Sequence, residues 1–126
     1  MSDSVLAQQI AYYRARAGEY DEWFYRRNRY DHGESLNQQW FDEVAVVQQA
    51  LQGLGDLGEV LELACGTGIW TQELAKQAAH VTALDASAEV LAINQAKLNA
   101  ANVSYQQVDL FAWPPERQYD FVFFSF

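Results

Sequence analysis

Basic residues, cysteine and long apolar runs are all scarce in this sequence. Its 126 residues include 8 Lys and Arg against 17 Asp and Glu, which gives a formal net charge of −9 at pH 7. Without a basic excess the chain has little to exchange for the counterions of a phosphate backbone, so we expect no nucleic-acid partner. An anionic membrane surface is disfavoured for the same reason. No apolar run approaches membrane-spanning length. The first residues do not show the basic segment followed by an apolar segment that is typical of a signal peptide.

Cysteine occurs once, at Cys65, so no intrachain disulfide can form. A single cysteine without a secretion signal predicts a protein of a reducing compartment, and we expect a cytoplasmic location. Histidine is almost as rare, with only His32 and His80, and we expect no metal site. Half of the residues are nevertheless hydrophobic, which at this length is enough for one domain with a sizeable core.

A pair of glycines after a short apolar run carries most of the functional information. The run over 59–63 predicts a buried strand, Gly66 and Gly68 follow it with one residue between them, and a helical pattern begins next. Glycine tolerates positive φ and has no Cβ to block a close approach. A strand, a glycine turn and a helix in this order bring backbone N–H groups up to a ligand, typically one with a nucleotide part.

Strands and helices alternate from this turn onward. We expect one helix to begin after Gly68 and another to be capped by Ser87. The strands are expected at 59–63, 80–84, 103–108 and 119–126. Such alternation predicts an α/β fold with a parallel sheet and right-handed crossovers. We expect a single domain over 1–126, in which 36–126 forms the core.

Two helical segments precede the sheet. Residues 1–35 predict a helical cap rich in Arg and Tyr, with a first helix that Gly18 ends and a second over 21–25. The cap is either a solvated amphipathic pair or a lid whose Tyr hydroxyls or Arg16 meet a carboxylate, and the residue types alone favour the first interpretation. The helix expected over 36–54 carries an apolar stripe, which we expect to pack against the sheet. The stripe consists of Leu36, Trp40, Val44, Val47, Leu51 and Leu54.

Acidic residues stand at the carboxyl ends of three successive predicted strands, at Glu62, Asp85 and Asp109. Ligands of open parallel sheets bind outside these strand ends. A carboxylate about 20 residues beyond a glycine turn is placed to accept hydrogen bonds from two ribose hydroxyls. Asp85 can also be interpreted as a residue at a helix N-terminus and Asp109 as a turn residue. The three carboxylates taken together with the glycine turn favour a ligand site.

The third glycine of a dinucleotide-binding turn is missing, because Thr71 stands in its place. This departure weakens the interpretation as a nicotinamide-dependent oxidoreductase, whose pyrophosphate has to reach the helix N-terminus. An acidic rim is better suited to a nucleoside that has no phosphates and carries a positive charge.

Four segments resemble, in order, the first four motifs of class I S-adenosylmethionine-dependent methyltransferases. These segments are 60–68, 81–87, 103–110 and 119–124. In addition, 12–17 with Tyr20 and Asp21 resembles the N-terminal segment that precedes the first motif in small bacterial members. The resemblance implies a Rossmann-like parallel sheet in the order 3-2-1-4, with helices on both faces and the N-terminal helical cap. It implies S-adenosylmethionine as the cofactor and a small-molecule methyl acceptor. Family members have more strands than this chain supplies, so we expect the domain to be C-terminally incomplete.

The resemblance also implies roles for individual residues. The glycine turn would lie against the methionine part and the ribose of the cofactor, and Glu62 would favour its amino group. Asp85 would bind both ribose hydroxyls, and Asp109 would accept from the adenine amino group. The further contact residues it implies are Tyr13, Arg16, Tyr20, Ala64, Cys65, Gly66, Gly68, Ala86, Leu110, Ser125 and Phe126. No residue is assigned a catalytic role, and Cys65 is expected to be a small buried residue, because no histidine is placed to activate it.

Two hypotheses about activity follow. In the first the chain is an enzyme, and methyl transfer is an in-line displacement from a sulfonium in which the protein mainly aligns the reactants. In the alternative the chain is a catalytically incomplete cofactor-binding fragment or module. In either case the apolar last strand leaves an edge that invites pairing, so we expect a homodimer through this strand.

Overall fold

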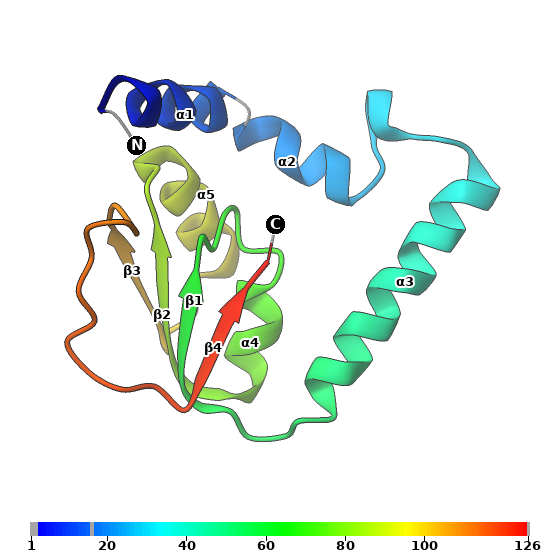
Figure 1. Ribbon diagram of the computed structural model, residues 1–126. Coiled ribbons are helices and arrows are strands. Elements are labelled where there is room, and N and C mark those ends of the chain that lie inside the picture. Colours follow the sequence, from blue (N-terminus) through cyan, green and yellow to red (C-terminus); the bar gives the residue numbers. More distant parts are fainter. Residues whose placement is uncertain (1–2, 16, 126) are drawn as a thin grey trace.

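A four-stranded parallel sheet lies at the centre of the computed structural model, which describes residues 3–15 and 17–125 (Figure 1). The strands are β1 (Gly58–Leu63), β2 (Ala78–Asp85), β3 (Val103–Gln107) and β4 (Phe121–Phe124). Their order in the sheet is β3-β2-β1-β4, and every neighbouring pair is parallel. The predicted α/β fold and strand order are therefore confirmed. The last strand is shorter than the predicted 119–126, because regular pairing with β1 begins only at Phe121.

Two crossover helices pack on one face of this sheet. Helix α4 (Thr71–Gln77) connects β1 to β2, and α5 (Ala88–Leu98) connects β2 to β3. Alternate strand residues point to this face, and they form the core with one apolar side chain from each helix. This core includes Val60, Val81, Ala83, Leu74 and Leu91, all of them buried. On the opposite face of β4, Val122 and Phe124 are each 55% exposed.

The cap of α5 shows how local sequence sets an element boundary. The Ser87 hydroxyl accepts a hydrogen bond from the Val90 N–H at 3.3 Å, as the sequence predicts for an N-cap. At the other end Asn99 adopts the left-handed conformation with φ 46°, which ends the helix before β3. Helix α5 is thus bounded by two local signals, the Ser87 cap at its start and the left-handed Asn99 at its end.

The N-terminal residues form α1 (Asp3–Ala15), α2 (Ala17–Phe24) and the short 3₁₀ helix η1 (Asn28–Tyr30). Figure 1 shows α1 and α2 lying beyond the carboxyl ends of the strands. The predicted N-terminal helices are confirmed, although Gly18 lies inside α2 and does not end the first helix. No helix within 3–15 and 17–125 is long and apolar enough to cross a membrane.

Helix α3 (Glu34–Gln52) confirms the predicted long helix, but most of its apolar stripe does not pack against the sheet. Leu51 is buried in the core, whereas Leu36 is 60% and Leu54 57% exposed. Trp40 packs its ring on aromatic side chains of α2, and its indole N–H donates to the Phe24 carbonyl at 2.7 Å. The N-terminal half of α3 is therefore held by α2, away from the sheet (Figure 1).

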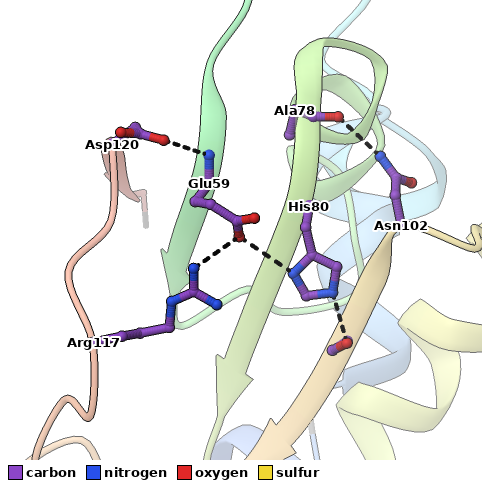
Figure 2. A network of polar contacts seen from close by, with 7 residues as sticks. Glu59, Ala78, His80, Asn102, Arg117 and Asp120 are labelled. Carbon is purple, nitrogen blue, oxygen red and sulfur yellow. Dashed lines mark hydrogen bonds and ion pairs between the residues drawn. The ribbon is translucent and has the colours of Figure 1, made fainter.

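A polar network joins β4 to β1 at the amino ends of the strands (Figure 2). The Asp120 carboxylate accepts a hydrogen bond from the Glu59 N–H at 2.8 Å, and the Asp120 N–H donates to the Glu59 carbonyl, also at 2.8 Å. The Glu59 carboxylate lies 3.6 Å from the Arg117 guanidinium and 3.8 Å from His80 Nδ1. Gly58 is required beside them, because its φ is +66° and a Cβ there would lie 2.4 Å from the Asp120 carboxylate. Asp120 and His80 thus serve the sheet at the end opposite to the glycine turn.

We expect Asp120→Ala to lower the free energy of unfolding by about 1–2 kcal/mol, because the Glu59 N–H loses its acceptor. Urea unfolding of the purified chain measures this change. Asp120→Asn keeps an acceptor and should lose less, and Glu116→Ala removes a charge from the same exposed loop and should change stability by less than about 0.5 kcal/mol. Equal losses for Asp120→Ala and Glu116→Ala would show that the network does not hold β4.

Candidate functional site

The candidate site begins at the turn between β1 and α4. Ala64, Gly66 and Gly68 all have positive φ, at 53°, 58° and 100°. A left-handed conformation costs an alanine roughly 1 kcal/mol, which explains why glycine is the usual residue at the first of these positions. The turn is tied to the neighbouring strand by the Cys65 N–H, which donates to the Leu84 carbonyl at 2.9 Å. The predicted glycine turn is therefore present at the carboxyl end of β1.

Asp85, the last residue of β2, lies directly against this turn. Its Oδ2 atom accepts a hydrogen bond from the Gly66 N–H at 3.1 Å, and its Oδ1 atom accepts from the Ser87 N–H at 3.0 Å. Asp85 thus lies at a helix N-terminus, as one interpretation predicts, and it also lies beside the glycine turn. Each carboxylate oxygen has a second lone pair, so a ligand hydroxyl can still donate to it.

Glu62 lies beneath the turn with only 2% of its surface exposed. Burial raises the pKa of its carboxyl group to about 8, a hydrogen bond from the Thr71 hydroxyl opposes this change, and the negative charge of Asp85 adds to it. The Thr71 hydroxyl donates to Glu62 Oε1 at 2.5 Å. Thr71, which replaces the third glycine of a dinucleotide turn, therefore serves to satisfy a buried acid.

Asn94 is the residue of this site that our sequence analysis missed. It is fully buried, its side-chain amide donates to the Gly66 carbonyl at 3.1 Å and to the Thr71 hydroxyl at 3.0 Å, and its carbonyl accepts from the Tyr105 hydroxyl at 2.7 Å. A Cβ at Gly68 would lie only 2.7 Å from the Asn94 side-chain oxygen. The signal was an amide on the otherwise apolar face of a helix, which indicates a buried polar contact.

The segment after β3 reaches the same rim of the sheet. The Val108 N–H donates to the Asp85 carbonyl at 3.0 Å, which places Asp109 and the half-buried Leu110 next in the chain. Asp109 Oδ1 accepts a hydrogen bond from the Phe111 N–H at 2.9 Å, so Asp109 stabilises the turn that follows β3. Ala86, half-buried, accepts from the Gln107 side chain through its carbonyl at 3.2 Å.

The remaining predicted contact residues come from the two ends of the chain. Tyr20 of α2 lies over the turn, with its ring 3.9 Å from the position that a Cβ would take at Gly66. Burial raises the pKa of Tyr20, and the negative charges of Asp21, Asp85 and Glu62 raise it further. Ser125 is half-buried just after β4.

Three of the predicted contacts cannot be placed. Tyr13 belongs to α1, but the structure does not describe its side chain. Arg16 and Phe126 lie outside the described residues.

Cys65 is buried within the turn, and this burial raises the pKa of its thiol far above the usual range. A protonated, inaccessible thiol is not a nucleophile, so Cys65 acts in packing. In the part of the chain that the structure describes, no group of three or more His, Cys, Asp or Glu residues could hold a metal ion. The site therefore offers an acidic rim, a glycine turn and a covering tyrosine, which fit a ligand with hydroxyl groups or positive charge.

Several known proteins are similar to this chain. Residues 60–126 match the methyltransferase domain family. A malonyl-[acyl-carrier protein] O-methyltransferase of Bacillus cereus is 37% identical over 65 residues, which are 50% of this chain and 24% of that enzyme. The structure of a DhpI–SAH complex is 41% identical, covers 98% of this chain and 54% of its own, and has a TM-score of 0.78. A DhpI–SAM–HEP complex, also 41% identical, has a TM-score of 0.75 and covers 98% of this chain and 52% of its own.

The chain thus spans about a quarter of the Bacillus cereus enzyme and about half of DhpI. The family match extends over more than half of the chain, from β1 through β4. It includes the glycine turn, Asp85 and the buried Glu62, which are the residues that define the site geometry. The chain therefore belongs to the methyltransferase domain family, as a class I S-adenosylmethionine-dependent methyltransferase domain.

Proposed function

We propose that this chain binds S-adenosylmethionine at the carboxyl ends of β1 and β2 and acts in methyl transfer to a small-molecule acceptor. The observation that carries the proposal is the Asp85 carboxylate, which is held against the glycine turn by the Gly66 and Ser87 N–H groups. A carboxylate fixed in this way can accept hydrogen bonds from two ribose hydroxyls at once. DhpI, which is 41% identical to this chain, forms a complex with SAM and HEP, and this supports the cofactor.

The other residues would then each contact a different part of the cofactor. Glu62 lies below the turn, toward the amino group of the cofactor, and Asp109 serves the adenine amino group. Tyr20 covers the turn from α2. The remaining proposed contacts are Tyr13, Arg16, Ala64, Cys65, Gly66, Gly68, Ala86, Leu110 and Ser125.

A nicotinamide dinucleotide fits this site less well. Its pyrophosphate would need bare backbone at the start of α4, where the third glycine normally allows a close approach. Thr71 stands there instead, fully buried and bonded to Glu62 and Asn94. The acidic side chains nearby would also repel the two phosphates.

The contribution of this chain to the reaction is binding and alignment. S-adenosylmethionine supplies an activated methyl group on a sulfonium. The turn and Asp85 would fix the ribose, the cap would exclude water, and the acidic rim would favour the positive charge of the ligand. We propose that residues 1–35 form this cap and 36–126 the cofactor-binding core of one domain. The alternative function is that of a cofactor-binding module without catalytic turnover.

We expect S-adenosylmethionine to bind this chain in a calorimetric titration and NAD not to bind. Asp85→Ala should weaken binding by about tenfold or more, because hydrogen bonds to a charged acceptor are lost. Glu43→Ala on the exposed side of α3 removes the same charge and should leave the affinity unchanged. A folded chain that does not bind S-adenosylmethionine would refute the proposal, and formation of S-adenosylhomocysteine with a panel of small metabolites would distinguish an enzyme from a binding module.

The raised pKa of Glu62 predicts a pH dependence of stability. The carboxyl group of the folded, empty protein stays protonated between its ordinary pKa of 4.5 and about 8, whereas that of the unfolded chain is ionised. The unfolded state thus binds fewer protons in this window, so stability falls as the pH rises, by at most about 1.4 kcal/mol per pH unit.

Glu62→Gln keeps an acceptor for Thr71 and removes the ionisation. We expect the difference in unfolding free energy between this variant and the parent chain to increase in favour of the variant as the pH rises from 5 to 8. Urea unfolding at several pH values measures this difference. Parallel stability profiles of the two proteins would contradict the raised pKa of Glu62.

We also propose that two copies of the chain associate through β4. Within the described residues β4 is the last strand on its side of the sheet, and Val122 on its outer face is 55% exposed. Unpaired strand edges with apolar side chains favour pairing with another chain.

Sedimentation velocity should therefore show a dimer that grows with protein concentration, and Val122→Lys should shift the equilibrium toward monomer. The matched control is Val46→Lys, at a 65% exposed position of α3. A strictly monomeric parent chain, or an equal effect of the two substitutions, would contradict pairing through β4.

A further inference from the structure

The carboxylate of Asp21 connects three elements that are far apart in the sequence. Asp21 lies in α2, and its Oδ1 atom accepts a hydrogen bond from the Thr67 hydroxyl in the glycine turn at 2.5 Å. Its Oδ2 atom lies 2.7 Å from the Lys97 ammonium group in α5. Both oxygens of one carboxylate are thus engaged, one by the turn and one by the helix that supports the turn.

This bridge differs from an ordinary surface ion pair. The side chains of Asp21 and Lys97 are only 25% and 30% exposed, and Thr67 is almost fully buried. Charge-assisted hydrogen bonds between partly buried groups are stronger than neutral ones, and salt screens them less than exposed pairs. The Thr67 hydroxyl belongs to the turn itself, so the bridge fixes α2 relative to the backbone that we propose binds the cofactor.

The position of Tyr20 follows from the same contact. Tyr20 directly precedes Asp21, and its ring lies against Gly66 on the side of the turn that α2 covers. A ligand that extends along the turn toward Asp85 would therefore lie close to Tyr20, on the side that α2 covers. The first part of α2 is joined to the turn through Asp21, while Trp23 and Phe24 at its other end pack on Trp40 of α3. Phe24 also contacts Trp70 at the start of α4, so the aromatic end keeps contacts of its own when the bridge opens.

We infer that Asp21 is a positioning residue, which holds α2 and Tyr20 over the glycine turn by bridging Thr67 and Lys97, so that the cofactor exchanges only when this bridge opens. The inference rests on the proposed function, since it assigns the residue that closes the same site. It predicts that loss of the bridge leaves the sheet intact, frees α2 and speeds the release of the cofactor.

The variants separate the bridge from its surroundings. Asp21→Asn removes the charge, Thr67→Val removes the hydroxyl with little change of shape, and Lys97→Met removes the ammonium group. Lys97→Arg retains the positive charge and serves as the conservative rescue. Glu22→Gln is the matched control, because it removes a negative charge from the next residue of α2, whose carboxylate accepts from Asn28 and not from the turn.

The first measurement is hydrogen–deuterium exchange of the chain without ligand. We expect peptides that cover 17–24 to exchange faster by at least severalfold in Asp21→Asn, Thr67→Val and Lys97→Met. Peptides from β1 and β2 should be unchanged, and Lys97→Arg and Glu22→Gln should behave like the parent chain. Unchanged exchange of 17–24 in the three bridge variants would overturn the inference.

The second measurement is the release of S-adenosylmethionine, followed by stopped-flow fluorescence of Trp23 and the other tryptophans. We expect release to be about tenfold faster in the three bridge variants, with a smaller change in the association rate constant. The Thr67→Val and Lys97→Met effects should not add in the double variant, because both act through Asp21. Faster exchange of α2 with unchanged release would show a purely structural bridge and overturn the positioning role. A parent chain that binds no S-adenosylmethionine would refute the proposed function itself, which is a different outcome.

Discussion

The arrangement of the site depends on one carboxyl group that has almost no contact with water. Glu62 is buried beneath the glycine turn, and an ionised acid there would be costly unless a partner compensated it. The structure meets this cost by raising the pKa of the group and by giving it the Thr71 hydroxyl as a donor. Thr71 is in turn held by Asn94, which also bonds the Gly66 carbonyl and the Tyr105 hydroxyl. The shape of the turn therefore follows from a connected polar network below it.

This network explains residue choices that a motif alone leaves open. Glycine is needed at position 68, because even a Cβ there would collide with Asn94. Thr71 occurs where a dinucleotide-binding turn has glycine, because its hydroxyl satisfies Glu62 and its methyl group is buried. The same residue thus stabilises the turn, and the proposed preference for a ligand without a pyrophosphate rests on it.

The two ends of the sheet have different tasks. At the amino ends Asp120 and Arg117 contact Glu59 of β1, and His80 of β2 contacts the carboxylate of Glu59 (Figure 2). At the carboxyl ends the contacts join the turn to Asp85 and, through Asp21, to α2. The contacts that hold the strands together and those that position the cap are thus separated by the length of the sheet.

Much of this protein could be predicted from its sequence, because the signals were local. The Ser87 cap and the glycine turn follow from short motifs whose geometry is set by neighbouring residues, whereas the strand order was predicted only through the family resemblance. The apolar stripe of α3 was placed correctly at Leu51 but not at Trp40, since periodicity identifies a buried face but not the partner that buries it. Trp40 packs on α2 instead of the sheet.

Only the tertiary structure decided the role of Asn94 and of Asp21. Asn94 meets the turn across 28 residues of sequence, and Asp21 meets Thr67 across 46. No local pattern specifies such pairs, because they form only when separate elements are brought together by the burial of the core. The sequence by itself determined that a glycine turn and an acidic rim would share one edge of a parallel sheet. The packing of α2 and α5 around that edge determined which side chains hold the turn in place and which hold the cap over it.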